Sequence, residues 1–272
     1  MKKYSALIVP VVLVLAGCAN GSEITSSATP TPSISSSPDA TAQVALYYVG
    51  DTHAGFRLYK EVSTVPLDAT GDLGRSALAA LVSQDTVATD PDYTNLWGNG
   101  SVINSVTVTS GVAVVDLTIA HLNVGAETEM RAIDQLVWTL TENDKAITSV
   151  TFTSQGKTLE TFAGHVDATK PFTRETDYEV LASVWVDDIP VGAKRVTGTA
   201  CTFEAGVAWK LLQGTSVIMQ DYTTAQSGCP IRGTWSVTLP ELDPGKYTFV
   251  AMDLSAEDGT VSQQDSKDFV VQ

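Results

Sequence analysis

The sequence VINSVTVTSGVAVVDL, which spans Val102–Leu117, decides the fold of the first half of the chain. Valine alternates with serine and threonine between Ser105 and Thr109, which is the period-two pattern of a strand. Ser110-Gly111 is a residue pair of the kind that closes a two-residue hairpin loop. Val112–Leu117 then returns as an apolar partner strand, so the stretch predicts a β-hairpin.

Helical and strand patterns lie on both sides of this hairpin. Apolar residues recur at helical spacing from Leu73 to Val82, which predicts an amphipathic helix of about three turns. A longer helix is expected from Ala126 to Glu142, with Glu127 and Glu129 favouring its N-terminus. Together with strands these helices predict an α+β domain over residues 43–174, with helices on one face of a sheet. The expected inner face of the longer helix is Met130, Ile133, Leu136, Val137 and Leu140, and the expected further strands are Val44–Val49, Arg57–Val65 and Ser149–Thr153.

The second half of the chain shows strand patterns only. After a short linker at Glu175–Asp177, brief apolar runs follow one another at the spacing of an all-β sandwich, which we expect over residues 178–272. Leu242–Tyr247 reads as a turn that leads to a tyrosine whose hydroxyl bonds back to the loop, as in the tyrosine corner of immunoglobulin-type sandwiches. The expected strands are Val180–Val186, Arg195–Thr202, Val207–Leu212, Ser216–Tyr222, Trp235–Leu239, Tyr247–Asp253 and Lys267–Val271.

Spaced motifs in the first domain resemble those of a known family. They are Asp116 within Val114–Thr118, then Gln135–Thr141, Val150 and Gly156, together with Tyr93, Trp97 and Gly100 before the hairpin. On these motifs, residues 44–174 resemble the sporulation and germination domain called GerMN, although Gly98 stands where a proline is usual. The resemblance implies a fold like that of the ring-building modules of sporulation secretion assemblies and a place in the cell envelope. It implies no catalytic residues.

Residues 180–272 carry a second resemblance. The residues concerned are Gly198, Ala200, Phe203–Ala205, Trp209, Gly233, Trp235 and Asp258-Gly259. They resemble the immunoglobulin-like domain of bacterial spore germination proteins. The segment between Asp188 and Val196 is shorter than the Pro-containing approach that this family usually has. The resemblance therefore implies an immunoglobulin-like sandwich with an altered first connection.

The N-terminal residues resemble the export signal of a bacterial lipoprotein. Lys2-Lys3 precede an apolar run from Ala6 to Leu15, which is too short to span a membrane. Leu15–Cys18 resembles the lipobox, in which the cysteine is acylated and becomes the first residue after cleavage. The alternative is a plain secretory signal with a chance cysteine. We expect a signal peptide at residues 1–17, a lipid anchor on Cys18, a Ser/Thr/Pro-rich tether at residues 18–42, and a location on the extracytoplasmic face of the cell membrane.

The other two cysteines and the overall charge limit the partners. Cys201 and Cys229 remain as a pair in an exported protein, which favours a disulfide, with two unpaired thiols as the alternative. The chain has 16 basic and 31 acidic residues and a net charge of −15, which disfavours binding to nucleic acid. The same charge disfavours unspecific adsorption to an anionic cell wall. Any wall contact must therefore be local.

No catalytic or metal-binding pattern emerges from the sequence. His53, His121 and His165 have no second His or Cys at ligand spacing, and no nucleophile elbow or phosphate-binding loop occurs. Asp116 could be a buried acid, but capping of nearby N–H groups explains it equally well, and Glu204 is similarly ambiguous. Three acids at the turn near Gly259 (Asp253, Glu257 and Asp258) fall short of the ligand number of calcium. We therefore predict no enzyme activity, no cofactor and no metal.

The best binding candidate in the sequence is the stretch Asp90–Gly100. It combines aromatic rings and amides, a composition suited to stacking on a sugar while bonding its hydroxyls. The alternative is that the rings cover the sheet. The candidate residues are Tyr93, Asn95, Trp97 and Asn99.

These features predict a non-catalytic, lipid-anchored envelope protein. We expect it to bind or scaffold at the cell wall, through peptidoglycan or an envelope protein partner. The alternative is an accessory or regulatory subunit of a cell-wall enzyme or envelope signalling system. A hydrolase is the least favoured class.

Overall fold

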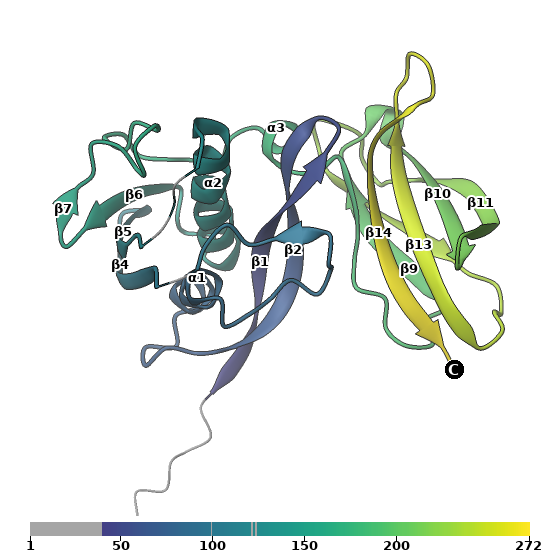
Figure 1. The fold of residues 1–272 in the computed structure, drawn as a ribbon, viewed down its shortest axis with the longest axis horizontal. Helices are drawn as coiled ribbons and strands as arrows, with labels where there is room; N and C mark the ends of the chain where they lie inside the picture. Colours follow the sequence, from purple (N-terminus) through teal and green to yellow (C-terminus); the bar gives the residue numbers. More distant parts are fainter. Residues whose placement is uncertain (1–39, 99, 121, 123) are drawn as a thin grey trace, which may run out of the picture. The chain divides into compact units, whose positions relative to one another are not determined.

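Strands and helices alternate in the first half of the chain, and nearly all elements of the second half are strands (Figure 1). The structure is a computed structural model that describes residues 40–98, 100–120, 122 and 124–272. All of them fall within one compact unit, Asp39–Gln272. The predictions for the signal peptide, for Cys18 and for nearly all of the tether lie outside the described residues. Within the described part, no helix is long and apolar enough to cross a membrane.

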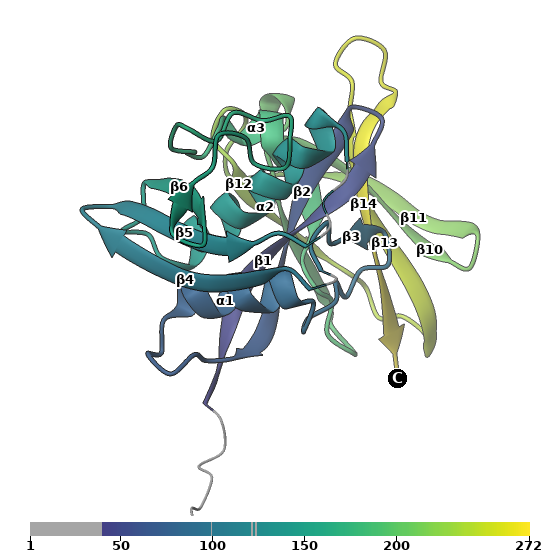
Figure 2. The ribbon, with the colours of Figure 1, turned by 60° about the vertical axis from the view of Figure 1, so that its left-hand side comes forward.

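The first half contains two sheets. One has the order β2-β1-β3 and the other β4-β5-β6-β7, with β5 and β6 parallel. The strands are β1 (Thr41–Thr52), β2 (Gly55–Pro66), β3 (Tyr93–Thr94), β4 (Val102–Thr109), β5 (Val112–Thr118), β6 (Ser149–Ser154) and β7 (Lys157–Thr158). The predicted hairpin is β4–β5, which lie side by side in Figure 2. Its turn has Ser110 at φ 51° and Gly111 at φ 81°, and these two positive angles are those of a type I′ turn.

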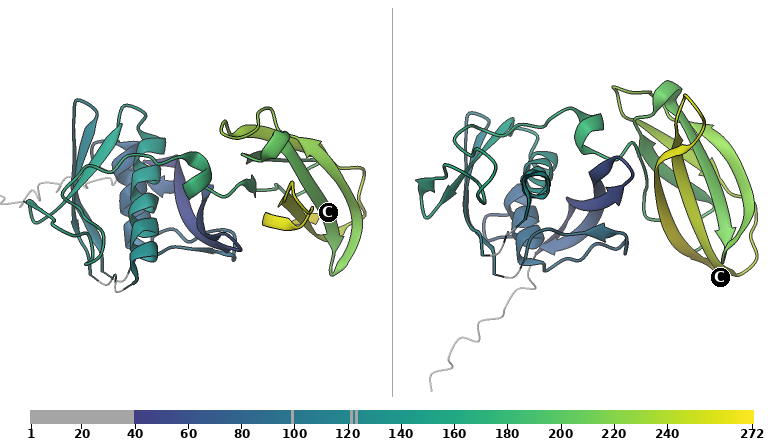
Figure 3. Two further views of the ribbon diagram at one scale, coloured as in Figure 1. Left: turned by 90° about the horizontal axis from the view of Figure 1, so that it is seen from above. Right: turned by 45° about the horizontal axis from the view of Figure 1, so that its top comes forward.

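Helices α1 (Leu73–Ser83) and α2 (Ala126–Asn143) lie between the two sheets, so each sheet has helices on one face (Figures 1 and 3). Asp72 caps α1 by accepting a hydrogen bond from the Arg75 N–H. The apolar faces of both helices and both sheets form one core. Two residues of α2 differ from the prediction. Met130, which was expected on the inner face, is only half-buried, and Glu129, which was expected only to favour the N-terminus, is fully buried.

The second half is a two-sheet sandwich with the strand orders β12-β9-β8 and β11-β10-β13-β14. Its core stacks Trp209 and Trp235 against Phe249. The Tyr247 hydroxyl donates a 2.8 Å hydrogen bond to the Asp243 carbonyl, which confirms the predicted tyrosine corner. The strands are β8 (Val184–Val186), β9 (Arg195–Ala200), β10 (Gly206–Gln213), β11 (Ser216–Thr224), β12 (Gly233–Thr238), β13 (Gly245–Leu254) and β14 (Val261–Val271), and a short 3-10 helix lies at Phe203–Ala205.

Two expected strands of the sandwich are different in the structure. The predicted strand Val180–Val186 is replaced by a helical turn, α3 (Asp177–Val180), and by the three-residue strand β8. The side chains of β8 alternate between two cores, with Trp185 in the core of the first half and Val184 and Val186 in the sandwich core. Strand β14 begins six residues earlier than predicted, because polar residues before Lys267 pair with β13.

Candidate functional site

The predicted binding loop packs against the core. The Trp97 side chain is 2% exposed, and its Nε1 donates to the Ala132 carbonyl at 3.0 Å. The Asn95 amide donates to the Leu81 carbonyl at 2.7 Å. Tyr93 is also buried. Neither ring has an open face for a sugar, so the packing alternative describes these side chains; Asn99 lies outside the described residues.

Tyr93 connects this loop to the sandwich. Its hydroxyl donates a 2.7 Å hydrogen bond to Oδ1 of Asp265 on β14, while Oδ2 of Asp265 accepts the Val186 N–H at 2.6 Å. The Tyr93 ring stacks on Tyr59 with centroids 4.5 Å apart. Both the hydroxyl and the ring of Tyr93, which the sequence indicated as a binding residue, are therefore in contact with other residues of the protein.

Lys267 lies at the centre of a second set of contacts next to Tyr93. Its Nζ is 2.7 Å from Oδ2 of Asp90 and 3.5 Å from Oε1 of Glu61, and it lies 4.3 Å from the centre of the Tyr93 ring. Both carboxylates also accept backbone N–H groups: Glu61 from Thr89 and Asp90, and Asp90 from Asp92. The charged groups are buried, yet each has partners, as buried charges require. We call Glu61, Asp90, Tyr93, Asp265 and Lys267 the buried ionic cluster.

Burial and neighbouring charges shift the protonation of the cluster. Burial raises the pKa of Asp265 to about 7, although the Val186 N–H and the charge of Lys267 oppose the shift. Burial alone would lower the pKa of Lys267, but the hydrogen bond to Asp90 and the charge of Asp265 outweigh it and raise that pKa. Burial and the charge of Asp265 also raise the pKa of Tyr93. Lys267 therefore stays charged at neutral pH, while Asp265 gains or loses a proton there.

Replacing Asp265 with Asn should change how stability depends on pH. Its pKa of about 7 in the folded state lies above the unfolded value of about 3.9, so folded Asp265 retains a proton that the unfolded chain has lost. Its contribution to stability therefore falls as the pH rises from about 4 to 7. We expect Asp265→Asn to reduce the loss of unfolding free energy between pH 5 and pH 8 by about 3 kcal/mol, measured by urea titration.

An independent second case of the same effect is Asp134→Asn in α2. Burial raises the pKa of Asp134 to about 7 as well, but its partner is Arg131, outside the cluster. The double variant should show the sum of the two changes in pH dependence, because the sites share no contact. An Asp265→Asn protein with the unchanged pH profile would contradict the assignment.

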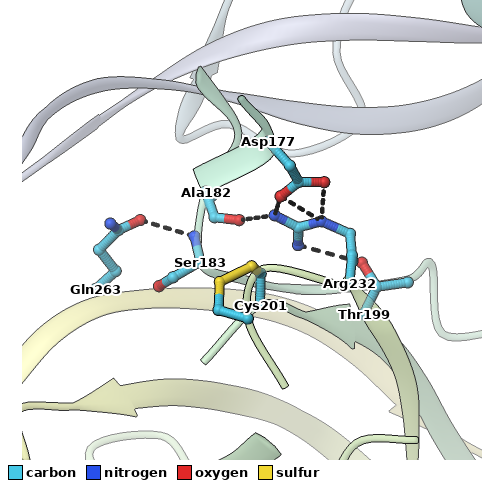
Figure 4. The surroundings of a disulfide bond; sticks show 8 residues. Asp177, Ala182, Ser183, Thr199, Cys201, Arg232 and Gln263 are labelled. Carbon is cyan, nitrogen blue, oxygen red and sulfur yellow. Dashed lines mark hydrogen bonds and ion pairs between the residues drawn. A yellow bond between two sulfur atoms is a disulfide. The ribbon is translucent and has the colours of Figure 1, made fainter. Parts of the chain in front are cut away.

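The segment between the two halves is fixed by Arg232 (Figure 4). The Arg232 guanidinium binds the Asp177 carboxylate at 2.6 to 3.1 Å and donates to the Ala182 carbonyl at 2.7 Å. It also lies 4.2 Å from the centre of the Trp185 ring. Such a forked, stacked contact is specific to arginine. The expected linker at Glu175–Asp177 is therefore the start of a segment that Arg232 holds in place through Asp177 and Ala182.

Further contacts fix the same segment from both sides. The Ala182 N–H donates to the Leu58 carbonyl of β2 at 3.0 Å. The Ser183 N–H donates to Oε1 of Gln263 at 2.9 Å, and the Ser183 carbonyl accepts the Cys201 N–H at 2.7 Å. Figure 4 shows Ala182, Ser183 and Gln263 near the disulfide that the structure forms between Cys201 and Cys229, whose Cα atoms are 4.5 Å apart.

The remaining polar candidates also have partners within the protein. Oδ1 of Asp116 accepts the Gly156 N–H at 3.0 Å and the Thr153 hydroxyl at 2.9 Å, and these bonds lower its pKa, as the capping alternative describes. The buried carboxylate of Glu129 binds the N–H groups of a loop and Nδ1 of His165 at 2.8 Å. Among the described residues, no group of three or more His, Cys, Asp or Glu side chains could hold a metal ion.

Sequence reasoning missed the buried ionic cluster because its members are far apart in the chain. Lys267 and Asp90 are separated by 177 positions, and no local pattern pairs them. One signal was present: Asp265 and Lys267 occupy the same face of a strand as the buried Phe269. Charged residues at such inward positions indicate a buried ion pair.

Comparisons with known proteins agree with both resemblances. Residues 45–160 match the family model described as sporulation and spore germination (Germane). Residues 179–260 match the model described as the immunoglobulin-like domain of bacterial spore germination. No curated protein matches the chain.

Three solved structures show similarity to parts of the chain. The first GerMN domain of the sporulation protein GerM from Bacillus subtilis is 21% identical, with a TM-score of 0.37, over 49% of this chain and 98% of that one. A putative lipoprotein from Clostridium perfringens is 18% identical, with a TM-score of 0.35, over 49% and 88%. The tandem GerMN domains of GerM are 18% identical, with a TM-score of 0.39, over 67% and 59%. By the two family matches, residues 45–160 form a domain of the sporulation and spore germination family, and residues 179–260 form an immunoglobulin-like domain of bacterial spore germination.

Proposed function

We propose that this protein is a non-catalytic, lipid-anchored component of the cell envelope that binds or scaffolds at the cell wall. One observation carries the proposal. The buried ionic cluster and the ion pair between Arg232 and Asp177 connect the two domains, which belong to one compact unit. A unit joined in this way presents both domains to a partner in a fixed arrangement. This property suits a scaffold on a tether.

The chemistry of the cluster supports a structural role. Lys267, Asp90 and Asp265 could be mistaken for a catalytic lysine with two acids, a combination that enzymes do use. Here the ammonium group lies between carboxylates that also bind backbone N–H groups, and each acid has at least two partners. An arrangement of this kind stabilises one packing of the two domains.

The anchor part of the proposal rests on the sequence. Leu15–Cys18 closes an apolar run that is shorter than a membrane span, and the residues after Cys18 are rich in Ser, Thr and Pro. In this proposal Cys18 carries fatty acyl chains such as palmitate, and the folded unit lies on the extracytoplasmic side. The net charge of −15 implies that contact with the wall is local, through peptidoglycan or an envelope protein.

Cys18→Ala should move the protein from the membrane fraction to the soluble fraction of cells while leaving the described residues folded. The reason is that stable anchoring by lipid requires the acylated thiol. Cell fractionation and labelling with an alkyne analogue of palmitate measure the effect. Ser27→Ala, which changes a tether residue and leaves both the Cys18 thiol and the disulfide in place, should stay in the membrane fraction. A Cys18→Ala protein that still required detergent for extraction would end the anchor proposal.

The binding role is tested separately by crosslinking in intact cells. Wild-type protein is crosslinked, purified and compared with Cys18→Ala, and purified protein is also sedimented with isolated peptidoglycan sacculi. Binding to sacculi alone supports peptidoglycan as the partner, and a protein crosslinked only in anchored form supports an envelope protein. If neither occurs, the proposed binding role is wrong.

A further inference from the structure

Strand β14 is an edge strand whose outer side is covered at two points. It pairs with β13 on one side only. On the other side, the Gln264 carbonyl accepts the Tyr59 hydroxyl at 3.5 Å, and the Val270 carbonyl accepts the Gly192 N–H at 3.2 Å. In an antiparallel strand, every second residue directs its N–H and C=O to the same side. Ser266 and Asp268, which lie between these two points, therefore direct theirs to the outer edge.

These outward groups are unpaired. Among the described residues, no backbone group outside the β13 ladder bonds to the N–H or C=O of Ser266 or Asp268. Unpaired edges of this kind accept an additional strand. The open segment is short because both of its ends are covered, which restricts it to a docking strand of a few residues.

A cavity of about 520 Å³ opens at this segment. Its walls are the loop Thr89–Asp92 on one side and Asp188 and Ile189 on the other, with Ser266–Asp268 between them. A second cavity of about 280 Å³ shares Asp92 and Ser266 with it. The larger volume lies within the range of ligand sites in proteins. We call the two cavities together the β14 groove.

The charge of the groove selects its occupant. Asp92, Asp188 and Asp268 are exposed around the opening. Lys267 also lines the groove, but its ammonium group is bound to Asp90. The free charge at the opening is therefore acidic, and it favours cationic side chains.

We propose that the β14 groove binds a short extended peptide segment bearing lysine or arginine side chains, which adds a strand to β14 at Ser266–Asp268. The N–H and C=O groups of these two residues offer two donors and two acceptors to the backbone of the segment. Its cationic side chains then lie near Asp92 and Asp188. The inference deepens the proposed function, on which it rests for the location of the partner, because it names the partner as a basic protein segment.

A labelled peptide tests the groove in solution. The probe is a fluorescein-labelled Lys-Val-Lys-Val-Lys peptide, titrated into residues 39–272, which form one compact unit. Two controls are the same peptide with N-methylated backbone amides, which keeps the charge but removes donors, and Glu-Val-Glu-Val-Glu. We expect saturable binding of the first peptide, binding weaker by about 10-fold or more for the N-methylated one, and none for the acidic one.

Protein variants locate the site. Asp92→Asn with Asp188→Asn should weaken binding of the lysine peptide by about 10-fold, whereas Glu241→Gln with Glu257→Gln, an equal charge change at exposed positions outside the groove, should leave it nearly unchanged. Ser266→Pro removes an outward N–H without removing a ladder bond and should also block binding. Hydrogen exchange at residues 264–268 should slow when peptide is bound.

The outcomes separate strand addition from simple charge attraction. Equal binding of the N-methylated peptide, equal effects of the two charge variants, or no binding of the lysine peptide would each overturn the proposal. If Ser266→Pro does not fold, the peptide controls still decide. The experiment uses residues 39–272, which do not include Cys18. A lack of peptide binding would therefore count against the β14 groove and would leave the lipid anchor and the binding to sacculi to their own tests.

Discussion

Lys267→Met should lower the free energy of unfolding by about 3–5 kcal/mol, the usual cost of removing one partner of a buried ion pair. Methionine fills a similar volume but leaves Asp90 and Glu61 buried without their cation. Chemical denaturation of residues 39–272 at pH 7 measures the change. We also expect faster hydrogen exchange in residues 89–93, because this loop is connected to β14 through Lys267.

The matched control is Lys246→Met on the neighbouring strand β13. Lys246 is exposed, so the same chemical change should alter stability by less than about 0.5 kcal/mol. Adding Asp90→Asn to Lys267→Met should recover part of the loss, since one buried charge is then neutral. If Lys267→Met were no more harmful than Lys246→Met, the cluster would not join the domains.

The fold was predictable from sequence wherever a local pattern determines it. Ser110-Gly111 closes the β4–β5 hairpin because both residues adopt positive φ. The spacing of Ile133, Leu136 and Leu140 places one face of α2 in the core. These patterns depend on neighbours within a few residues, which a single sequence displays.

The segment Asp177–Val186 was not predictable because distant contacts determine it. Its apolar run is typical of one strand, but Asp177 binds Arg232 and Leu181 bridges to Leu58 of β2. These contacts fix a helical turn before β8 and bury the run between two cores. Tertiary contacts override strand propensity here.

The candidate site was predicted only in part. The loop Asp90–Gly100 does contain residues of importance, since Asp90 and Tyr93 belong to the buried ionic cluster. Their partners Asp265 and Lys267 come from the last strand, however, and composition cannot reveal such a pairing. Aromatic residues near amides are typical both of a glycan site and of a packed loop. The burial of the aromatic side chains distinguishes a packed loop from a glycan site, and burial is known only once the fold is known.

Removing the disulfide should also have a large effect. The double variant Cys201→Ala with Cys229→Ala should lose about 3–4 kcal/mol of unfolding free energy, because the bond closes a loop with a sequence separation of 28 and so restricts the unfolded chain. Denaturant titration measures this loss. Wild-type protein unfolded in the presence of a reductant should lose the same amount, while the double variant should not respond to the reductant.

The disulfide also affects the folded protein, in addition to restricting the unfolded chain, because it lies next to the contacts of Arg232. Cys229 is three residues from Arg232, and the N–H of the buried Cys201 bonds to the carbonyl of Ser183, next to Ala182. Loss of the bond should therefore weaken the contact between Arg232 and Asp177, with faster hydrogen exchange in residues 177–183. Lys267→Met should not affect this segment to the same degree, since its contacts are with residues 61, 90 and 93. If both variants accelerated exchange equally at the same amides, the contacts between the two domains would open as one cooperative unit. Separate patterns would show that the disulfide stabilises residues 177–183 and that the buried ionic cluster stabilises residues 89–93.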